Sequence, residues 1–369
     1  MKVLITGSKG FIGKNLVAQL NNNEEVEVFE FHRNTSLALL DKYCEKVDFV
    51  FHLAGVNRPK NDSEFVEGNI ELTEELLALL KKHNNTCPVM ISSSTQAGLD
   101  NPYGESKSIG EQLVFNHGKE TKAKILVYRF PNVFGKWSKP NYNSVIATFC
   151  HNIAHNLEIE INNPNAELNL VYIDDVISEL IHAMHGDENK VGQYCEVTRT
   201  YKRTLQEIAN LIYMFKESRQ DKSIPNMNEP FTKKLYSTYL SFLPKNKFNY
   251  PLKMNIDNRG SFTEFIKTKD RGQLSINVSK PGITKGNHWH HTKNEKFLVV
   301  KGQGVIRFRQ PDSEEVIEYF VSDEKLEVVD IPVGYTHNIE NLGASDMVTI
   351  MWVNEIFNPE DPDTYYLEV

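Results

Sequence analysis

A tyrosine and a lysine four residues apart, Tyr103 and Lys107, offer the clearest chemistry in the sequence. On a helix the two side chains would share one face, so the ammonium could lower the pKa of the phenol and let Tyr103 pass a proton at neutral pH. Ser94, separated from Tyr103 by eight residues, would orient a carbonyl group for this transfer. We therefore predict Tyr103, Lys107 and Ser94 as catalytic residues; the alternative is a half-exposed tyrosine beside a solvated lysine.

Three histidines and a glutamate form a second group of reactive side chains. His288 and His290 would point to the same side of a strand, and Glu295 and His337 could complete a metal site with them. Imidazole and carboxylate ligands favour Zn, Fe, Ni, Mn or Cu over Mg or Ca, and zinc is our first expectation. The alternative is a set of surface histidines beside a turn, which is what we expect of His291.

Three glycines, Gly7, Gly10 and Gly13, lie between the first expected strand and the first expected helix. Glycines permit a tight turn there and let backbone N–H groups and the positive end of the helix approach a pyrophosphate. The spacing alone also fits an ordinary strand-to-helix turn.

The end of the second expected strand decides between the two nicotinamide dinucleotides. An acidic residue there would bind the ribose 2′-hydroxyl, whereas a cation would accept a 2′-phosphate. The sequence has Phe31, His32 and Arg33 at this place, and a guanidinium suits phosphate. We predict NADP(H), with Arg33 at the 2′-phosphate, aided by His32 or Lys9. The alternative is that Arg33 is a solvated loop cation.

The elements that must position these residues change character along the chain. Up to about residue 215, short apolar runs alternate with stretches of helical period, which predicts βαβ units and a Rossmann-type, doubly wound parallel sheet. From about residue 255, β-rich runs between Gly, Pro and Asp turns predict an all-β sandwich or small barrel. We place the first domain at residues 1–247 and the second at residues 248–369.

Composition argues against several kinds of partner. The formal charge of −8 and the pI near 5.9 give no general attraction to nucleic acid. No run approaches the roughly 18 apolar residues that span a membrane, and the first residues lack a signal-peptide pattern, so we expect no membrane association and a cytoplasmic protein. The four cysteines are scattered and predict neither disulfides nor a thiolate zinc site.

The first domain resembles the extended short-chain dehydrogenase/reductase family. Besides the glycine segment, the matching pieces are residues 48–55, Asn69, residues 92–94, residues 103–107, residues 129–135 and residues 171–176. The resemblance implies that the dinucleotide contacts Gly7, Gly10, Phe11, Ile12, Gly13, Leu53, Ala54 and Gly55. It also implies that Lys107 holds the nicotinamide ribose and that Tyr103 protonates the oxygen of a ketone as hydride arrives.

Two departures from that family narrow the reaction. Its dehydratases carry an Asp-Glu pair after the catalytic hydroxyl residue, whereas this chain has Thr95 and Gln96 after Ser94, so a 4,6-dehydratase is not expected. The connection between Ser94 and Tyr103 is also shorter than usual, which predicts a pocket that is more open or is completed by another domain or subunit.

The second domain resembles the cupins. The stretches 282–302 and 332–341 carry the four predicted metal ligands at the spacing of the two cupin motifs. Upstream, residues 257–264 resemble the opening motif of the nucleotide-sugar 3,5-epimerases, which are cupins. Arg259 and Glu264 could bind a nucleotide diphosphate from a strand that faces a pocket, although a charged turn would have the same composition.

The fusion of the two domains resembles the bifunctional capsular-polysaccharide enzymes of the UDP-N-acetyl-L-fucosamine pathway. A 4-keto group acidifies the C3 hydrogen of a sugar, which allows epimerisation, and the same ketone can then accept hydride. The resemblance implies that the cupin epimerises C3 of UDP-2-acetamido-2,6-dideoxy-xylo-4-hexulose, a UDP-linked 4-keto-6-deoxy-N-acetylhexosamine. The first domain would then reduce C4 with NADPH to UDP-N-acetyl-6-deoxy-L-talosamine. The resemblance also implies a homodimer. For the base of the epimerase, the sequence offers Glu264, Lys293 and Tyr335 without ranking them.

Two other functions fit the second domain. It could be a metal-stabilised dimerisation or docking module of an enzyme that only reduces keto-sugars, since four protein ligands suit structural zinc. It could also be an oxygenase, which would need iron or copper with open coordination positions.

Overall fold

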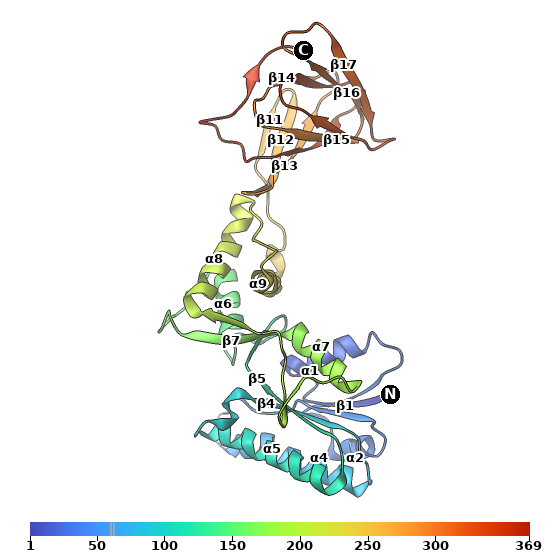
Figure 1. The fold of residues 1–369 in the computed structure, drawn as a ribbon, viewed down its shortest axis with the longest axis vertical. Helices are drawn as coiled ribbons and strands as arrows, with labels where there is room; N and C mark the ends of the chain where they lie inside the picture. The colour runs from blue at the N-terminus through green and yellow to red at the C-terminus, as the bar shows by residue number, and fades with distance from the viewer. Residues whose placement is uncertain (60, 62) are drawn as a thin grey trace. The chain divides into compact units, whose positions relative to one another are not determined.

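The structure of the protein, a computed structural model, describes residues 1–59, 61 and 63–369. The chain forms two compact units (Figure 1). The first comprises residues 1–213 and 228–244, and the second comprises residues 214–227 and 245–369. The boundary expected at residue 247 lies near the last crossing between the units, whereas the segment 214–227 joins the second unit earlier in the chain.

The first unit is built on a largely parallel sheet. Its seven strands follow the order β2 (Glu27–Phe31), β1 (Lys2–Thr6), β3 (Phe49–His52), β4 (Val89–Ser94), β5 (Ile125–Phe130), β9 (Tyr194–Cys195) and β8 (Lys190–Val191). The β8–β9 pair is antiparallel. The chain proceeds outward from β1 in both directions, and in such sheets ligands bind beside the carboxyl ends of the strands where the order reverses.

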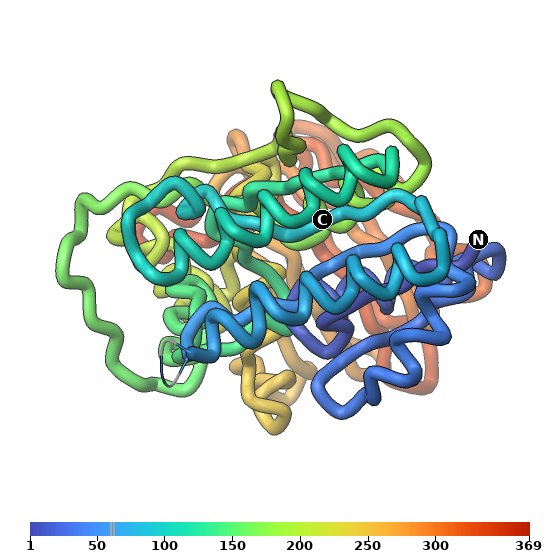
Figure 2. The backbone as a smooth tube through the Cα atoms, turned by 90° about the horizontal axis from the view of Figure 1, so that it is seen from below, coloured from blue at the N-terminus to red at the C-terminus, as the bar shows by residue number. Residues whose placement is uncertain are grey.

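Helices cover both faces of this sheet. Figure 1 shows α2 (Leu37–Cys44), α4 (Leu72–Lys82) and α5 (Pro102–Thr121) on one face, and α1 (Phe11–Leu20) and α7 (Ile173–Met184) on the other. Figure 2 shows α4 and α5 side by side.

Smaller elements complete the chain outside these layers. A three-stranded sheet has the order β10 (Tyr201–Thr204), β7 (Glu167–Tyr172) and β6 (Asn132–Phe134). The further helices are α3 (Ser63–Phe65), α6 (Val145–Ala154), α8 (Leu205–Asp221) and α9 (Pro230–Ser241), with a π-helical turn at Val66–Glu71 and 3-10 turns at Thr95–Gly98 and Lys245–Lys247.

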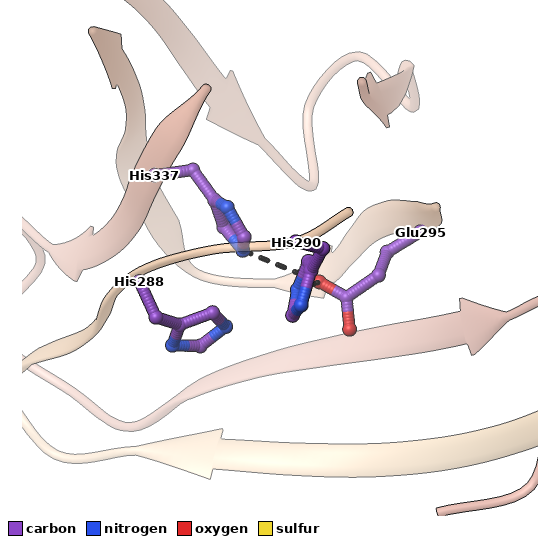
Figure 3. Close-up of side chains that lie close together, drawn as sticks. All are labelled: His288, His290, Glu295 and His337. Atoms are coloured by element: carbon purple, nitrogen blue, oxygen red, sulfur yellow. Dashed lines mark ion pairs between the residues drawn. The ribbon is translucent and has the colours of Figure 1, made fainter. Parts of the chain in front are cut away.

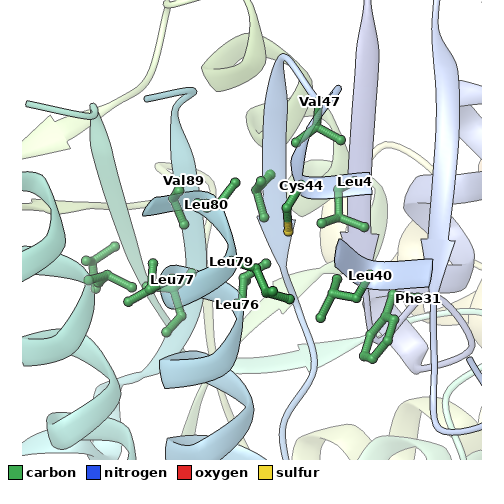
Figure 4. Close-up of a cluster of buried hydrophobic side chains, with 14 residues drawn as sticks. Leu4, Phe31, Leu40, Cys44, Val47, Leu76, Leu77, Leu79, Leu80 and Val89 are labelled. Atoms are coloured by element: carbon green, nitrogen blue, oxygen red, sulfur yellow. The ribbon is translucent and has the colours of Figure 1, made fainter. Parts of the chain in front are cut away.

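Aliphatic side chains form the core between the sheet and helices α2 and α4 (Figure 4). Leu76 and Leu80, one turn apart on α4, are fully buried with Leu40 of α2 against Leu4 and Val50 of the sheet. Burial of one such side chain contributes roughly 1.5–3 kcal/mol, so this layer fixes α4 firmly on the sheet.

The second unit consists of two antiparallel sheets. The first has the order β11 (Met254–Asp257), β12 (Gly260–Thr268), β13 (Gly272–Ser279), β20 (Met347–Val353), β15 (Glu295–Lys301) and β18 (Val328–Ile331). The second has the order β17 (Val316–Ser322), β16 (Gln303–Arg309), β19 (Thr336–Asn341), β14 (Thr284–Trp289) and β21 (Tyr365–Tyr366). Phe297 of the first sheet and Ile306, Phe308 and Ile339 of the second belong to one buried cluster.

Both predicted fold classes are confirmed. The first unit is a Rossmann-type, doubly wound α/β fold, and the second is an all-β cupin of the jelly-roll kind. Among the described residues, no helix combines the length and the apolar character needed to cross a membrane.

Candidate functional site

The start of α5 brings Tyr103 close to Ser94. Asn101 caps the helix, its side-chain oxygen accepting a hydrogen bond of 2.9 Å from the backbone N–H of Gly104. A Cβ atom on Gly104 would lie 2.4 Å from the carbonyl oxygen of Leu99, so glycine allows the helix to pack tightly on the short connection after β4. This arrangement brings the Tyr103 phenol close enough to Ser94 for the two side chains to interact.

Lys107 lies one turn after Tyr103 and is buried. Its ammonium donates a hydrogen bond of 3.1 Å to the carbonyl of Ser92 and lies 6.0 Å from the centre of the Tyr103 ring. Burial lowers the pKa of Lys107 to about 8. Burial also raises the pKa of Tyr103, and the interaction with Ser94 opposes this shift. The sequence predicted that Lys107 lowers the pKa of the phenol. The structure shows a raised pKa instead, because the effect of burial on Tyr103 is the largest one.

Asn69 holds this region together. Its side chain pairs with the backbone of Val56, accepting at 2.8 Å and donating at 3.1 Å, and also donates to Ser106 at 2.9 Å. A Cβ atom on Gly55 would lie 2.9 Å from the Asn69 oxygen and 3.0 Å from the Lys107 ammonium. Glycine at position 55 therefore leaves room for the asparagine and the lysine beside the end of β3.

The glycine segment has the form that a dinucleotide requires. Gly7 has a φ of +70°, and a Cβ atom there would lie 2.7 Å from the backbone nitrogen of Ala54. A Cβ atom on Gly13 would lie 2.2 Å from the carbonyl oxygen of Gly7. Gly10 begins α1 without any side-chain cap, so the first backbone N–H groups of the helix, those of Phe11 and Ile12 included, are not capped by a side chain. These features fit a bound pyrophosphate.

The carboxyl end of β2 lies beside this segment, as the parallel pairing of β1 with β2 requires. Arg33 is exposed there, and His32 is half-buried with its Nδ1 accepting a hydrogen bond of 3.3 Å from the backbone of Asn34. Lys9 instead forms an ion pair of 2.8 Å with Glu30. Glu30 was not considered from the sequence, because it precedes the last residue of the strand.

The four predicted metal ligands come together in the cupin unit (Figure 3). One ligand atom from each of His288, His290, Glu295 and His337 lies within 4.8 Å of the others. Nε2 of His337 is 3.2 Å from Oε2 of Glu295, and Nε2 of His290 is 3.7 Å from the same oxygen.

The donor atoms of this cluster fit a transition-metal ion. Nε2 of His290, Oε2 of Glu295 and Nε2 of His337 are buried and have no hydrogen-bond partner among the described residues. Burial lowers the pKa of His288 to about 4. Burial alone would raise the pKa of Glu295, but the imidazoles of His290 and His337 lower it to about 2. His288 and Glu295 are thus held as neutral imidazole and carboxylate, the forms that bind metal. Burial also acts to lower the pKa of His290, but Glu295 and the Asp363 carbonyl raise it.

Asp363, far along the chain, orients one ligand. Its backbone carbonyl accepts a hydrogen bond of 2.6 Å from Nδ1 of His290, which leaves Nε2 directed into the cluster. Its carboxylate accepts hydrogen bonds of 2.9 Å each from the backbone N–H groups of His291, Thr292 and Lys293. Asp363 thus anchors the turn between the second and third ligands, and Asn354 adds hydrogen bonds to Thr292 and Asn294.

A cavity of about 770 Å³ opens beside the cluster within the cupin unit. His288, Glu295 and His337 line it, together with Arg259 and Lys285. A divalent ion at the cluster would face this cavity, which is large enough for part of a nucleotide-sugar.

Comparisons with known proteins agree with this description of the two units. Residues 3–195 match the NAD dependent epimerase/dehydratase family, and residues 255–365 match the polysaccharide biosynthesis C-terminal domain. The whole chain is 44% identical to the UDP-2-acetamido-2,6-beta-L-arabino-hexul-4-ose reductase of Pseudomonas aeruginosa, over 99% of the length of that protein. The chain belongs to the NAD-dependent epimerase/dehydratase family, among its capsular-polysaccharide biosynthesis enzymes.

Two solved structures illustrate how far the likeness reaches. The capsular polysaccharide assembling protein CapF from Staphylococcus aureus is 57% identical, with a TM-score of 0.95 over the full length of both chains. The UDP-glucuronic acid 4-epimerase of Bacillus cereus covers 66% of this chain and 98% of its own length, with 19% identity and a TM-score of 0.55. The second likeness shows the fold alone.

The three residues that the sequence offered as the epimerase base, Glu264, Lys293 and Tyr335, do not line the cavity. The Glu264 carboxylate contacts the ammonium groups of Lys267 at 2.8 Å and Lys222 at 3.4 Å. Lys293 donates to the carbonyl of Pro362, and the Tyr335 hydroxyl accepts a hydrogen bond of 3.2 Å from Gln310. Of the charged pair expected to face the pocket, Arg259 does so and Glu264 does not.

Proposed function

We propose that the protein is a bifunctional enzyme of UDP-linked keto-sugars, in which the cupin unit epimerises C3 and the reductase unit then reduces C4 with NADPH. The proposal rests on the likeness over the whole chain to a reductase named for a UDP-linked hexul-4-ose. That name gives the L-arabino sugar, not the xylo sugar expected from the sequence, and we adopt UDP-2-acetamido-2,6-dideoxy-L-arabino-4-hexulose as the substrate. The product is UDP-N-acetyl-6-deoxy-L-talosamine.

In the reductase unit, Tyr103 gives its phenolic proton to the C4 oxygen of the sugar. Ser94, close to Tyr103, orients the same oxygen. Lys107 keeps a positive charge one turn away, and with the dinucleotide bound it would hold the nicotinamide ribose and help to return the proton to Tyr103. Bound NADPH supplies the hydride that reaches C4. Arg33, exposed at the end of β2, holds the 2′-phosphate.

In the cupin unit, His288, His290, Glu295 and His337 hold the metal, for which zinc is our first choice. A bound divalent ion supplies Lewis-acid stabilisation for negative charge on the C4 oxygen. Arg259, at the cavity, offers N–H groups that suit the diphosphate of the substrate.

We also propose a homodimer. The edge strand β17 carries exposed apolar side chains, with Tyr319 51% and Phe320 69% exposed, and exposed apolar patches favour association. Sedimentation of the wild type and of Phe320→Asp would test this, and an unchanged dimer in the variant would exclude β17 from the interface.

The deciding experiment supplies the L-arabino keto-sugar and NADPH to the full chain and identifies the product by NMR. We expect inversion at C3 and a hydroxyl at C4. A product that is reduced at C4 but unchanged at C3 would assign the cupin a structural or dimerising role. Absence of NADPH oxidation with this substrate would contradict the proposal as a whole. Tyr103→Phe serves as the control that stops reduction while leaving the cupin intact.

A further inference from the structure

A lysine of the cupin cavity lies outside every role considered so far. We propose that Lys285 is the catalytic base that removes the C3 proton of the keto-sugar. This inference rests on the epimerase activity proposed above and assigns that activity to one side chain.

Lys285 reaches the cavity because of a β-bulge. In the pairing of β14 with β19, Lys285 lies opposite Ile339 and His288 lies opposite His337, with a register shift between Gly286 and His288. Asn287, the extra residue, has a φ of +59°. The bulge places Lys285 on the same side of the strand as His288, although the two are an odd number of residues apart.

The Lys285 amine is held at a fixed position. It donates hydrogen bonds of 2.8 Å to the side-chain oxygen of Asn277 and 2.8 Å to the carbonyl of Val278. A neutral amine has two N–H groups, and these two acceptors use both, which leaves the nitrogen lone pair for a ligand. Burial lowers the pKa of Lys285, which favours this neutral form.

The other ionisable groups of the cavity are unsuited to the task. His288, Glu295 and His337 are the proposed metal ligands, whose donor atoms a bound ion would occupy. The Asp257 carboxylate accepts hydrogen bonds of 3.0 and 2.7 Å from Arg259, which lowers its pKa, and Arg259 does not lose its proton. Lys285 is the remaining candidate among the described residues that line the cavity.

The step is balanced by solvent water. The Lys285 nitrogen takes the C3 proton, the C–H electron pair forms a C3–C4 double bond, and the carbonyl π pair moves onto the C4 oxygen. Water then returns a proton to the opposite face of C3 as the double bond reverts to the ketone. The resulting hydroxide takes the proton from the lysine ammonium, so the enzyme is restored.

The test measures deuterium incorporation at C3 of the keto-sugar in D₂O without NADPH, using the full chain with its metal. Lys285→Gln keeps a hydrogen-bond donor but no basic nitrogen, and we expect its kcat for exchange to fall by about 100-fold or more. Lys285→Arg, which keeps the cation, should fall as far. Metal content and the midpoint of thermal unfolding should match those of the wild type.

Chemical rescue separates the base from a merely structural lysine. Treatment of Lys285→Cys with 2-bromoethylamine builds an amine of lysine length and should restore exchange, whereas the same treatment of Lys285→Gln should not. Exchange by Lys285→Gln within about threefold of wild type, or a higher KM with unchanged kcat, would overturn the assignment to Lys285 alone. No exchange by the wild type would overturn the epimerase proposal itself.

Discussion

The catalytic group of the reductase unit and the metal cluster of the cupin unit differ in whether their polar atoms have hydrogen-bond partners. In the reductase unit, Asn69, Ser106 and Lys107 are hydrogen-bonded to other groups of the protein. In the cupin unit, the donor atoms of His290, Glu295 and His337 are buried without such partners. Unpaired buried polar atoms cost free energy unless a ligand satisfies them. The reductase scaffold should therefore persist without its cofactor, whereas the cupin should depend on its metal.

The largest effect should come from Tyr103→Phe. Loss of the proton donor should lower the rate of NADPH oxidation with the keto-sugar by about 10³-fold, within the range expected of a general acid. Stopped-flow absorbance of NADPH measures the rate. Because the phenol lies in the reductase unit, metal content and C3 exchange should not change; loss of metal in this variant would contradict the separation of the two sites.

Removal of one metal ligand should destabilise the cupin. His337→Ala should lose the metal. Its free energy of unfolding should then fall by about 4 kcal/mol at a free metal concentration a thousandfold above Kd. Elemental analysis and thermal unfolding measure the two effects. The matched control is His291→Ala, since His291 is an exposed neighbour outside the cluster. Equal metal content in both variants would exclude the predicted site.

A smaller effect should follow from Arg33→Ala. Hydrogen bonds to a charged group contribute about 1.5–3 kcal/mol, so KM for NADPH should rise by about 10-fold to 100-fold. KM for NADH, which has no 2′-phosphate, should barely change. Steady-state kinetics with both dinucleotides measure the difference, and equal changes would remove Arg33 from the cofactor site.

The last effect appears only in acid and concerns His52, a histidine held by hydrogen bonds instead of a metal. Its ring nitrogens lie 2.7 Å from the Thr6 hydroxyl and 2.9 Å from the Thr73 hydroxyl, and burial lowers its pKa to about 3. The unfolded chain binds a proton below about pH 6.5, whereas the folded chain does not until about pH 3. The contribution to stability is therefore complete above pH 6.5 and is lost as the pH falls towards 3.

His52→Gln should show a shallower loss of stability with acid. The difference in slope from the wild type should approach about 1.4 kcal/mol per pH unit in this range. Urea unfolding at several pH values measures the free energy of unfolding, and parallel curves for the two proteins would contradict the assigned pKa.

The sequence alone was sufficient for features that depend on local spacing. The helix expected after the glycine segment is α1 (Phe11–Leu20), because the glycines before it and its apolar period are both local signals. The four residues predicted as metal ligands also come together: the first motif places His288 and His290 on or beside β14 and Glu295 at the start of β15, and the second places His337 on β19.

Contacts between distant segments were not predictable. Nothing near Asp363 in the sequence indicates that it contacts His290, because the pairing depends on the route of the chain after β20. Glu264 was expected at the pocket, but its carboxylate forms an ion pair with Lys222, which follows the end of α8. Lys285 was overlooked because strict alternation along a strand would turn it away from His288, and only the bulge reverses this.

The hydrogen bond between His290 and Asp363 spans 73 residues, and this separation has a consequence during synthesis. Ribosomes add about 5–20 residues per second, so His290 waits roughly 4–15 seconds for the carbonyl that orients it. During that interval the turn after His290 lacks its carboxylate anchor. Firm capture of the ion in the cell therefore follows translation of residue 363, and a messenger truncated before that codon would yield a cupin that releases its metal.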